Sequence, residues 1–155
     1  MRTKISGKEV FQKDYGWHSG RFHFAFGDYE DPANQNFGVL CALNDFFVQP
    51  GMGFTTHPHA EMEIISFCVH GTLRHQDNMG NINELRPGDS QYTCTGSGIT
   101  HSEMNSVNDD FLRFLQIWVQ PRQKGLHPFY KEKNLLVKRK MVLCAISPQV
   151  KKGKA

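Results

Sequence analysis

Two short clusters of metal-ligand residue types stand about forty residues apart in this 155-residue sequence. Each cluster is a pair of donors separated by one position, namely His57-Pro58-His59 and His101-Ser102-Glu103. Residues two apart on a β-strand point to the same face, so two neighbouring strands would bring all four donors together. Three imidazoles and one carboxylate suit iron, nickel, copper, manganese or zinc, and they leave coordination positions open for a substrate or dioxygen.

Glycines precede both pairs and strengthen this prediction. Gly51 and Gly53 lie just before the first pair, and Gly96 and Gly98 lie just before the second. Glycine allows a tight turn and lets a ligand or another strand approach the backbone closely. A single H-x-H on a surface would be weak evidence for a metal, whereas two glycine-flanked pairs indicate a metal site.

The elements that must position these residues are predicted to be short strands. Several segments are β-branched, aromatic or alternating in polarity, and turn signals such as Arg86-Pro87-Gly88-Asp89 separate them. Strands that recur every 8–12 residues or so favour a sandwich or barrel. One weak helical stretch is predicted over residues 128–134. The predicted strands cover residues 37–43, 45–49, 61–69, 82–85, 90–95 and 111–119.

Length and composition indicate one globular domain with an ordinary core. The chain is 39% apolar and 21% charged, and a domain of this size needs neither disulfides nor a structural metal. The four cysteines are far apart with no C-x-x-C pair, so they are predicted to be reduced, with Cys68 in the core. Because no signal peptide or membrane-spanning stretch is evident, a cytoplasmic location is expected. No nucleotide-binding or serine-hydrolase motif is present.

Charge is distributed unevenly along the chain. Residues 131–155 contain eight Lys/Arg and one acid, whereas residues 1–130 contain ten Lys/Arg and fourteen acids. We interpret the basic segment as a solvated terminus. Neither a nucleic acid nor a membrane is expected as a partner.

The spacing of the donor clusters resembles the two motifs of the cupin superfamily. Those motifs are G-x(5)-H-x-H-x(3)-E at residues 51–63 and G-x-G-x(2)-H-x(3)-N at residues 96–105. More narrowly, residues 14–130 or so resemble the pirin family. The strings that carry this resemblance include FHFAFGDYEDP at residues 22–32, HQD at 75–77, PGD at 87–89 and QIW at 116–118.

The resemblance implies an all-β fold, a cupin-type β-barrel (double-stranded β-helix or jelly roll), with a short C-terminal extension. It implies one metal ion held by His57, His59, His101 and Glu103, with iron ahead of nickel, copper, manganese and zinc. Glu63 is the position used in many other cupins, but the pirin pattern gives the ligand role to Glu103. Some pirins are quercetinases that act on flavonols, and others regulate transcription.

The same resemblance implies a domain division. Residues 1–130 would form a pirin-like N-terminal cupin domain, and residues 131–155 a basic extension that is a remnant or swapped arm of a second cupin. Pirins usually carry two barrels in one chain. The face that a second barrel would cover is therefore expected to be exposed and apolar, which predicts a homodimer, formed for example by exchange of residues 135–150.

Three functional interpretations remain open at this stage. The first is a metal-dependent dioxygenase, a quercetin 2,3-dioxygenase that acts on a flavonol and dioxygen with Glu103 as the base. The second is a non-enzymatic, metal-dependent regulatory or protein-binding module. The third is a structural half-barrel without activity, against which the intact set of four donors argues.

Residues outside the two pairs are predicted to be structural or to lie on the surface. His75-Gln76-Asp77 would pin a hairpin through a histidine–aspartate hydrogen bond. Trp17 and Trp118 are predicted to be core aromatics. The same structural or surface interpretation applies to His18, His23, His70 and His127.

Overall fold

The computed structural model describes residues 9–134, which form eleven β-strands and no helix. The first six are β1 (Phe11–Asp14), β2 (His18–Phe22), β3 (Leu40–Val48), β4 (Gly53–His59), β5 (Glu63–His70) and β6 (Leu73–Asp77). The other five are β7 (Ile82–Leu85), β8 (Asp89–Cys94), β9 (Ile99–Asn105), β10 (Leu112–Val119) and β11 (Phe129–Asn134). No helix able to span a membrane is found in this part of the chain.

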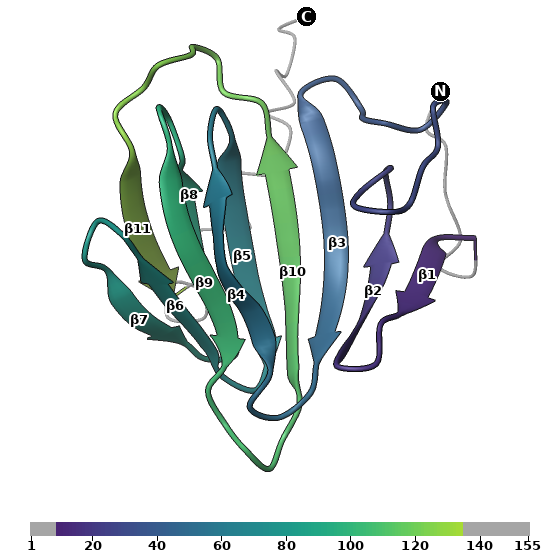
Figure 1. Cartoon of the computed structure of the whole chain (residues 1–155), viewed down its shortest axis with the longest axis vertical. Coiled ribbons are helices and arrows are strands. Elements are labelled where there is room, and N and C mark those ends of the chain that lie inside the picture. Colours follow the sequence, from purple (N-terminus) through teal and green to yellow (C-terminus); the bar gives the residue numbers. More distant parts are fainter. Residues whose placement is uncertain (1–8, 135–155) are drawn as a thin grey trace, which may run out of the picture.

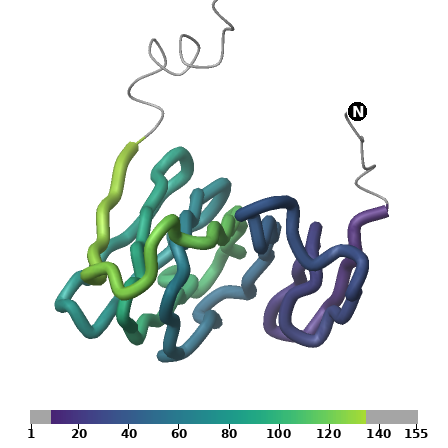
Figure 2. The backbone as a smooth tube through the Cα atoms, turned by 90° about the horizontal axis from the view of Figure 1, so that it is seen from above, coloured from purple at the N-terminus to yellow at the C-terminus, as the bar shows by residue number. Residues whose placement is uncertain are grey.

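The strands form two antiparallel sheets (Figure 1). The larger sheet has the order β1-β2-β3-β10-β5-β8-β11, and the smaller has the order β4-β9-β6-β7. The smaller sheet faces part of the larger one, while β1 and β2 lie to one side of it (Figures 1 and 2). This arrangement agrees with the predicted sandwich or barrel.

The interior between the sheets changes from apolar to polar along the strands. On β10, Leu112 and Phe114 belong to the apolar core, whereas Gln116 is a buried amide further along the same face. The strands of the smaller sheet contribute buried His101 and Glu103 from β9. The apolar part stabilises the sandwich, and the polar part is where chemistry can occur.

The apolar core confirms the prediction for Cys68, which is completely buried among phenylalanines and leucines. The three cysteines within the described residues are free thiols, as predicted. Trp17 packs against this core. The fully buried members of the cluster are Phe22, Phe46, Val48, Cys68, Leu73, Leu85, Leu112 and Phe114.

Two details of the predicted elements were wrong, and strands β1 and β2 were not predicted. The expected helix over residues 128–134 is instead strand β11, which pairs with β8 and places Phe129 opposite Cys94. Hydrogen bonding to an available sheet edge overrides a weak helical propensity. The strands predicted over residues 37–43 and 45–49 form the single strand β3.

The predicted domain boundary at residue 130 falls inside β11, whose first residues complete the larger sheet. Residues 131–134 therefore belong to the domain. The remainder of the predicted extension, including the arm at residues 135–150, lies outside the described residues.

Candidate metal centre

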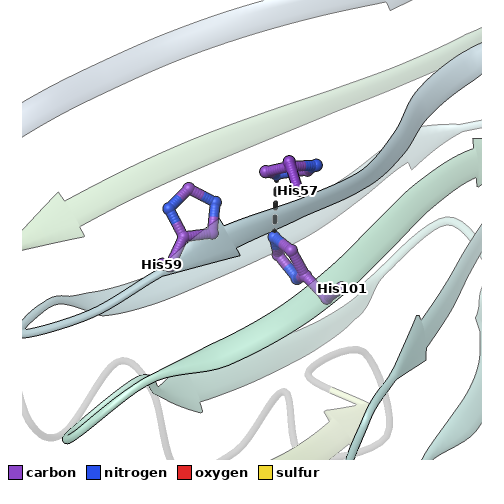
Figure 3. A group of neighbouring side chains, drawn as sticks. All are labelled: His57, His59 and His101. Carbon is purple, nitrogen blue, oxygen red and sulfur yellow. Dashed lines mark hydrogen bonds between the residues drawn. The ribbon is translucent and has the colours of Figure 1, made fainter.

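Strands β4 and β9 bring the three histidines of the two pairs together. The strands are antiparallel neighbours, and His57 lies directly opposite His101. The ring centroids are 4.6 Å apart for His57 and His101, 4.7 Å for His57 and His59, and 4.9 Å for His59 and His101. Their ligand nitrogens lie within 4.8 Å of one another (Figure 3). The pairing of the two strands thus brings three of the four predicted donors into one group, whereas Glu103 falls in a second group with His75 and His101.

The hydrogen bonds of His57 define which nitrogen is available. His57 Nδ1 lies 2.6 Å from the backbone oxygen of Thr55. A carbonyl oxygen can only accept, so Nδ1 donates and Nε2 keeps its lone pair. This Nε2 lies 3.1 Å from His101 Nε2, which donates to it (Figure 3). The lone pair on His57 Nε2 is therefore directed toward His101, and it would be free for a metal ion only once that hydrogen bond is released.

Burial keeps two of these imidazoles neutral. Desolvation, followed by the neighbouring imidazoles, lowers the pKa of His101 to about 3. The same causes lower the pKa of His59 to about 4, although Glu103 opposes the shift. Both rings are therefore unprotonated at neutral pH, which is the form that binds a metal.

Glu103 is a buried carboxylate surrounded by neutral donors. Its Oε1 accepts hydrogen bonds from Ser66 Oγ at 2.9 Å and Gln91 Nε2 at 2.8 Å. Its Oε2 accepts one from Gln116 Nε2 at 2.6 Å. A carboxylate has about four lone-pair sites, so about one site, on Oε2, remains uncommitted.

The donors to Glu103 come from the opposite sheet. Ser66 lies opposite Gln116 in the pairing of β5 with β10, and opposite Gln91 in the pairing of β5 with β8. These three side chains form a row across three adjacent strands, and the row faces Glu103 on β9. One sheet therefore supplies the metal-ligand residue types, and the other holds the carboxylate in position.

Two aromatic residues fix the orientation of the supporting amides. Trp118 Nε1 donates to Gln116 Oε1 at 3.0 Å, and the Tyr130 hydroxyl donates to Gln91 Oε1 at 3.3 Å. With each Oε1 acting as an acceptor, each Nε2 faces Glu103. Trp118 also contacts the ring of His59 edge-on, with centroids 4.9 Å apart.

Sequence analysis missed this supporting role. Trp118 was predicted to be a plain core aromatic, but it is only partly buried and lies beside a candidate ligand. The Gln116-x-Trp118 spacing places both side chains on one face of β10. This spacing is the feature of the sequence that could have indicated their contact. Gln91 and Ser66 had no comparable signal, because neither has a chemically distinctive neighbour in the sequence.

Two other predicted residues can now be placed. The predicted hydrogen bond between His75 and Asp77 is present, with His75 Nε2 3.1 Å from Asp77 Oδ2. His75 also belongs to a second group of candidate ligands, with His101 and Glu103, which was not predicted. Glu63 points to the opposite face of β5 from the buried Ser66. It belongs to neither group of candidate metal ligands found within residues 9–134.

The donor set fits a first-row divalent metal ion. Neutral imidazole nitrogens with one carboxylate oxygen are the ligands that such ions prefer. The outer hydrogen bonds to Thr55 and to Glu103 correspond to the support that metal ligands normally receive in proteins.

Comparison with known proteins identifies the relationship. The profile of the pirin family matches residues 4–119. The chain belongs to the pirin family. Its all-β architecture of two facing antiparallel sheets is the cupin-type jelly roll that the sequence predicted.

Relatives of this pirin carry two kinds of name. An Escherichia coli (strain K12) protein named quercetin 2,3-dioxygenase is 36% identical over 141 residues, which is 90% of this chain and 60% of the relative. A Caulobacter vibrioides pirin-like protein is 42% identical over 120 residues, which is 77% of this chain and 51% of the relative. This pirin thus spans between half and two thirds of the length of these relatives.

A solved structure supports the fold directly. A bacterial pirin from Escherichia coli in complex with nickel(II) superposes with a TM-score of 0.81 at 36% identity, covering 83% of this chain and 56% of that one. The structural similarity therefore covers about one half of the longer protein.

Proposed function

We propose that this pirin binds one divalent transition-metal ion through His57, His59, His101 and Glu103 and acts as a dioxygenase on flavonols such as quercetin. The observation that carries the proposal is the convergence of three imidazoles beside a buried carboxylate with one uncommitted lone-pair site. An Escherichia coli relative named quercetin 2,3-dioxygenase supports the choice of reaction.

We propose iron as the ion, with nickel, copper, manganese and zinc as alternatives that the same donors accommodate. A similar pirin has been solved in complex with nickel(II), which supports the choice of a divalent transition metal. When bound, such an ion would act as a Lewis acid and electron conduit between a flavonol anion and dioxygen.

Glu103 is the proposed catalytic base. The remaining lone pair on its Oε2 is the position that can accept a proton from a substrate hydroxyl, because the other sites already accept hydrogen bonds. The same lone pair is proposed to bind the ion. Glu103 would therefore either bind the ion or accept the proton at any one time. Its three hydrogen-bond donors hold the carboxylate in place in both roles.

An open hollow beside His59 is the proposed approach for the substrate. It has a volume of about 500 Å³ and is lined by Pro58, His59, Ala60, Asn78, Gly98, Ile99 and Thr100. Small-molecule sites typically have volumes of about 300–1,000 Å³. The backbone and apolar side chains of this lining suit a planar aromatic molecule.

Elemental analysis together with oxygen uptake in the presence of quercetin tests the proposal. We expect about one metal ion per chain and quercetin-dependent uptake in the wild type, and loss of both in His101→Ala. His70→Ala is the matched control, because His70 is an exposed histidine paired with Asp110 and lies outside the cluster. Bound metal without oxygen uptake would instead support a metal-dependent regulatory or binding module.

A further inference from the structure

A third pair of ligand-type residues lies next to the two predicted pairs. Strand β6 pairs with β9, so that His75 is opposite Glu103 and Asp77 is opposite His101. Three adjacent strands, β4, β9 and β6, each contribute two such residues spaced two positions apart. The side chains of His75 and Asp77 are completely buried.

The hydrogen bonding of His75 leaves one lone pair without a partner. The Asp77 carboxylate accepts from His75 Nε2, so His75 Nδ1 carries the lone pair, and this atom is buried without a hydrogen-bond partner among the described residues. Asp77 is itself held by Asn81 and by the backbone of Met79. An imidazole that donates to a fixed carboxylate on one side and presents a lone pair on the other is the usual arrangement of a metal-binding histidine.

The neighbours of His75 offer further acceptors. His101 Nε2 donates to His57, which leaves the lone pair of His101 on Nδ1, and that atom is also buried and unpartnered in the described part of the chain. Glu103 contributes its uncommitted lone pair. Buried acceptors that lack a donor are costly, and a cation satisfies several of them at once.

The geometry of these residues is compact. One ligand atom each from His75, His101 and Glu103 lies within 4.8 Å of the others, and all three residues are buried. Tyr130 stacks on the His75 ring, with centroids 4.5 Å apart and an angle of 22° between the planes, and so holds it in this orientation. Two ligands of one ion lie at most about 4 Å apart at usual metal–ligand lengths, so a small inward shift completes the site.

We propose that His75, His101 and Glu103 form a second, deeper position for the divalent metal ion. This inference rests on the proposed function, because the deeper position shares His101 and Glu103 with the first. The two positions are alternatives for a single ion, since Glu103 has one lone pair left for coordination. His57 and His59 bind the ion in the outer position, and His75 binds it in the inner one.

Cobalt(II) binding distinguishes the two positions. The full-length wild type and variants are dialysed against Co²⁺, the bound metal is counted by elemental analysis, and the visible absorption of the bound ion is recorded. We expect one ion in the wild type. The double variant His57→Ala/His59→Ala is expected to retain one ion, with lower affinity and a changed absorption spectrum.

Removal of His75 from that double variant is the decisive step. Adding His75→Leu should abolish the remaining Co²⁺ binding, whereas adding His70→Ala, the matched histidine control, should leave it intact. Thermal unfolding checks that each variant is folded, and His75→Gln replaces His75→Leu if the leucine variant does not unfold cooperatively. His101→Ala should lose both positions.

The outcomes separate the two proposals. If the wild type binds Co²⁺ and the double variant binds none, the deeper position does not exist and the outer site stands alone. Binding to the double variant that persists after removal of His75 also overturns the inference. If the wild type itself fails to bind Co²⁺, the proposed metal-dependent function is wrong.

Discussion

At the residue scale, the central feature is a carboxylate held by neutral donors. Gln116 can donate to Glu103 only while its amide keeps one orientation, and Trp118 fixes that orientation through its indole N–H. Interactions one step removed from a metal commonly change its affinity by a factor of about 10–100. Trp118 is therefore a positioning residue for the proposed centre.

We predict that Trp118→Phe weakens Ni²⁺ or Co²⁺ binding by about tenfold without unfolding the domain, because the substitution keeps an aromatic ring beside His59 but removes the donor to Gln116. A competition titration with a chromogenic chelator measures the effect. Trp17→Phe is the matched control, since Trp17 packs against His18 and Phe54 rather than a candidate ligand. Equal affinity in the Trp118 variant and the wild type would show that Gln116 keeps its orientation unaided.

His18 gives a pH prediction that is independent of the metal. It is nearly buried among aromatic rings, and desolvation lowers its pKa below the ordinary value, while Asp14 opposes the shift. The unfolded chain therefore takes up a proton at His18 more readily than the folded protein. Stability is lost as the pH falls below the unfolded pKa of about 6.5.

We expect His18→Phe to lose less stability than the wild type when the pH is lowered from 8 to 5. Thermal unfolding in the presence of a chelator measures this without a contribution from bound metal. The difference between variant and wild type isolates His18 from other titrating groups. A difference that stays constant with pH would contradict the prediction.

At the element scale, the segment between β10 and β11 is held against the turns that flank the histidine pairs. Ser97 N donates to Leu126 O at 3.0 Å, and Gly125 N donates to the Glu61 carboxylate at 3.0 Å. Glu61 adopts a left-handed conformation with φ of 56°. Gly96, which precedes the second pair, was predicted to let another group approach the backbone closely. The group that does so is the segment between β10 and β11.

Gly96 is the point of closest contact. A Cβ at this position would lie 2.0 Å from Leu126 O, and its φ is +44°. We predict that Gly96→Ala destabilises the fold by about 3 kcal/mol or more, because backbone would have to move. Gly27→Ala is the control, with φ of +59° and no heavy atom within 4 Å.

Gly27→Ala should cost only the conformational strain of about 1–2 kcal/mol. Urea denaturation of both variants measures the difference between the two free energies of unfolding. If Gly96→Ala and Gly27→Ala lost the same free energy of unfolding, the segment after β10 would move easily and would not hold the turns in place.

Strand assignments show how tertiary contacts decide weak local signals. Residues 128–134 have a mild helical preference, yet β11 pairs with β8 along its whole length. The edge of β8 offers hydrogen bonds that a single turn or two of helix could not replace. The segment over residues 111–119 was predicted to be a strand although its apolar residues lie on both faces, and β10 confirms that prediction.

At the scale of the whole molecule, several large apolar side chains remain exposed. Phe37 is 79% exposed and Val39 is 58% exposed, and Ile82, Met52 and Phe111 are also exposed. The relatives are longer, and this chain covers 60% and 51% of two of them. The sequence predicts that a partner surface covers such exposed apolar residues.

We predict that the 17.7 kDa chain forms a homodimer. Size-exclusion chromatography with light scattering over a range of protein concentrations measures the mass directly. A mass close to twice that of the chain is expected at high concentration. A monomer throughout the range would contradict the prediction.

The sequence by itself determined the fold class, the family and the three converging histidines. These depend on local regularities: strands have a period of two, so each H-x-H or H-x-E pair must share a face, and the glycines mark the turns that precede them. The register of β4 with β9 does not follow from this period alone, because the pairing shifts between Phe54 and His57.

Only the tertiary structure decided what surrounds those ligands. The donors to Glu103 come from β5, β8 and β10 of the opposite sheet, and Trp118 and Tyr130 orient two of them. His75 lies beside Glu103 because β6 pairs with β9. The hydrogen bonds to Glu103 join residues of different sheets that are distant in sequence. Apart from the Gln116-x-Trp118 spacing, no local pattern indicates them, and the packing of the two sheets brings them into contact.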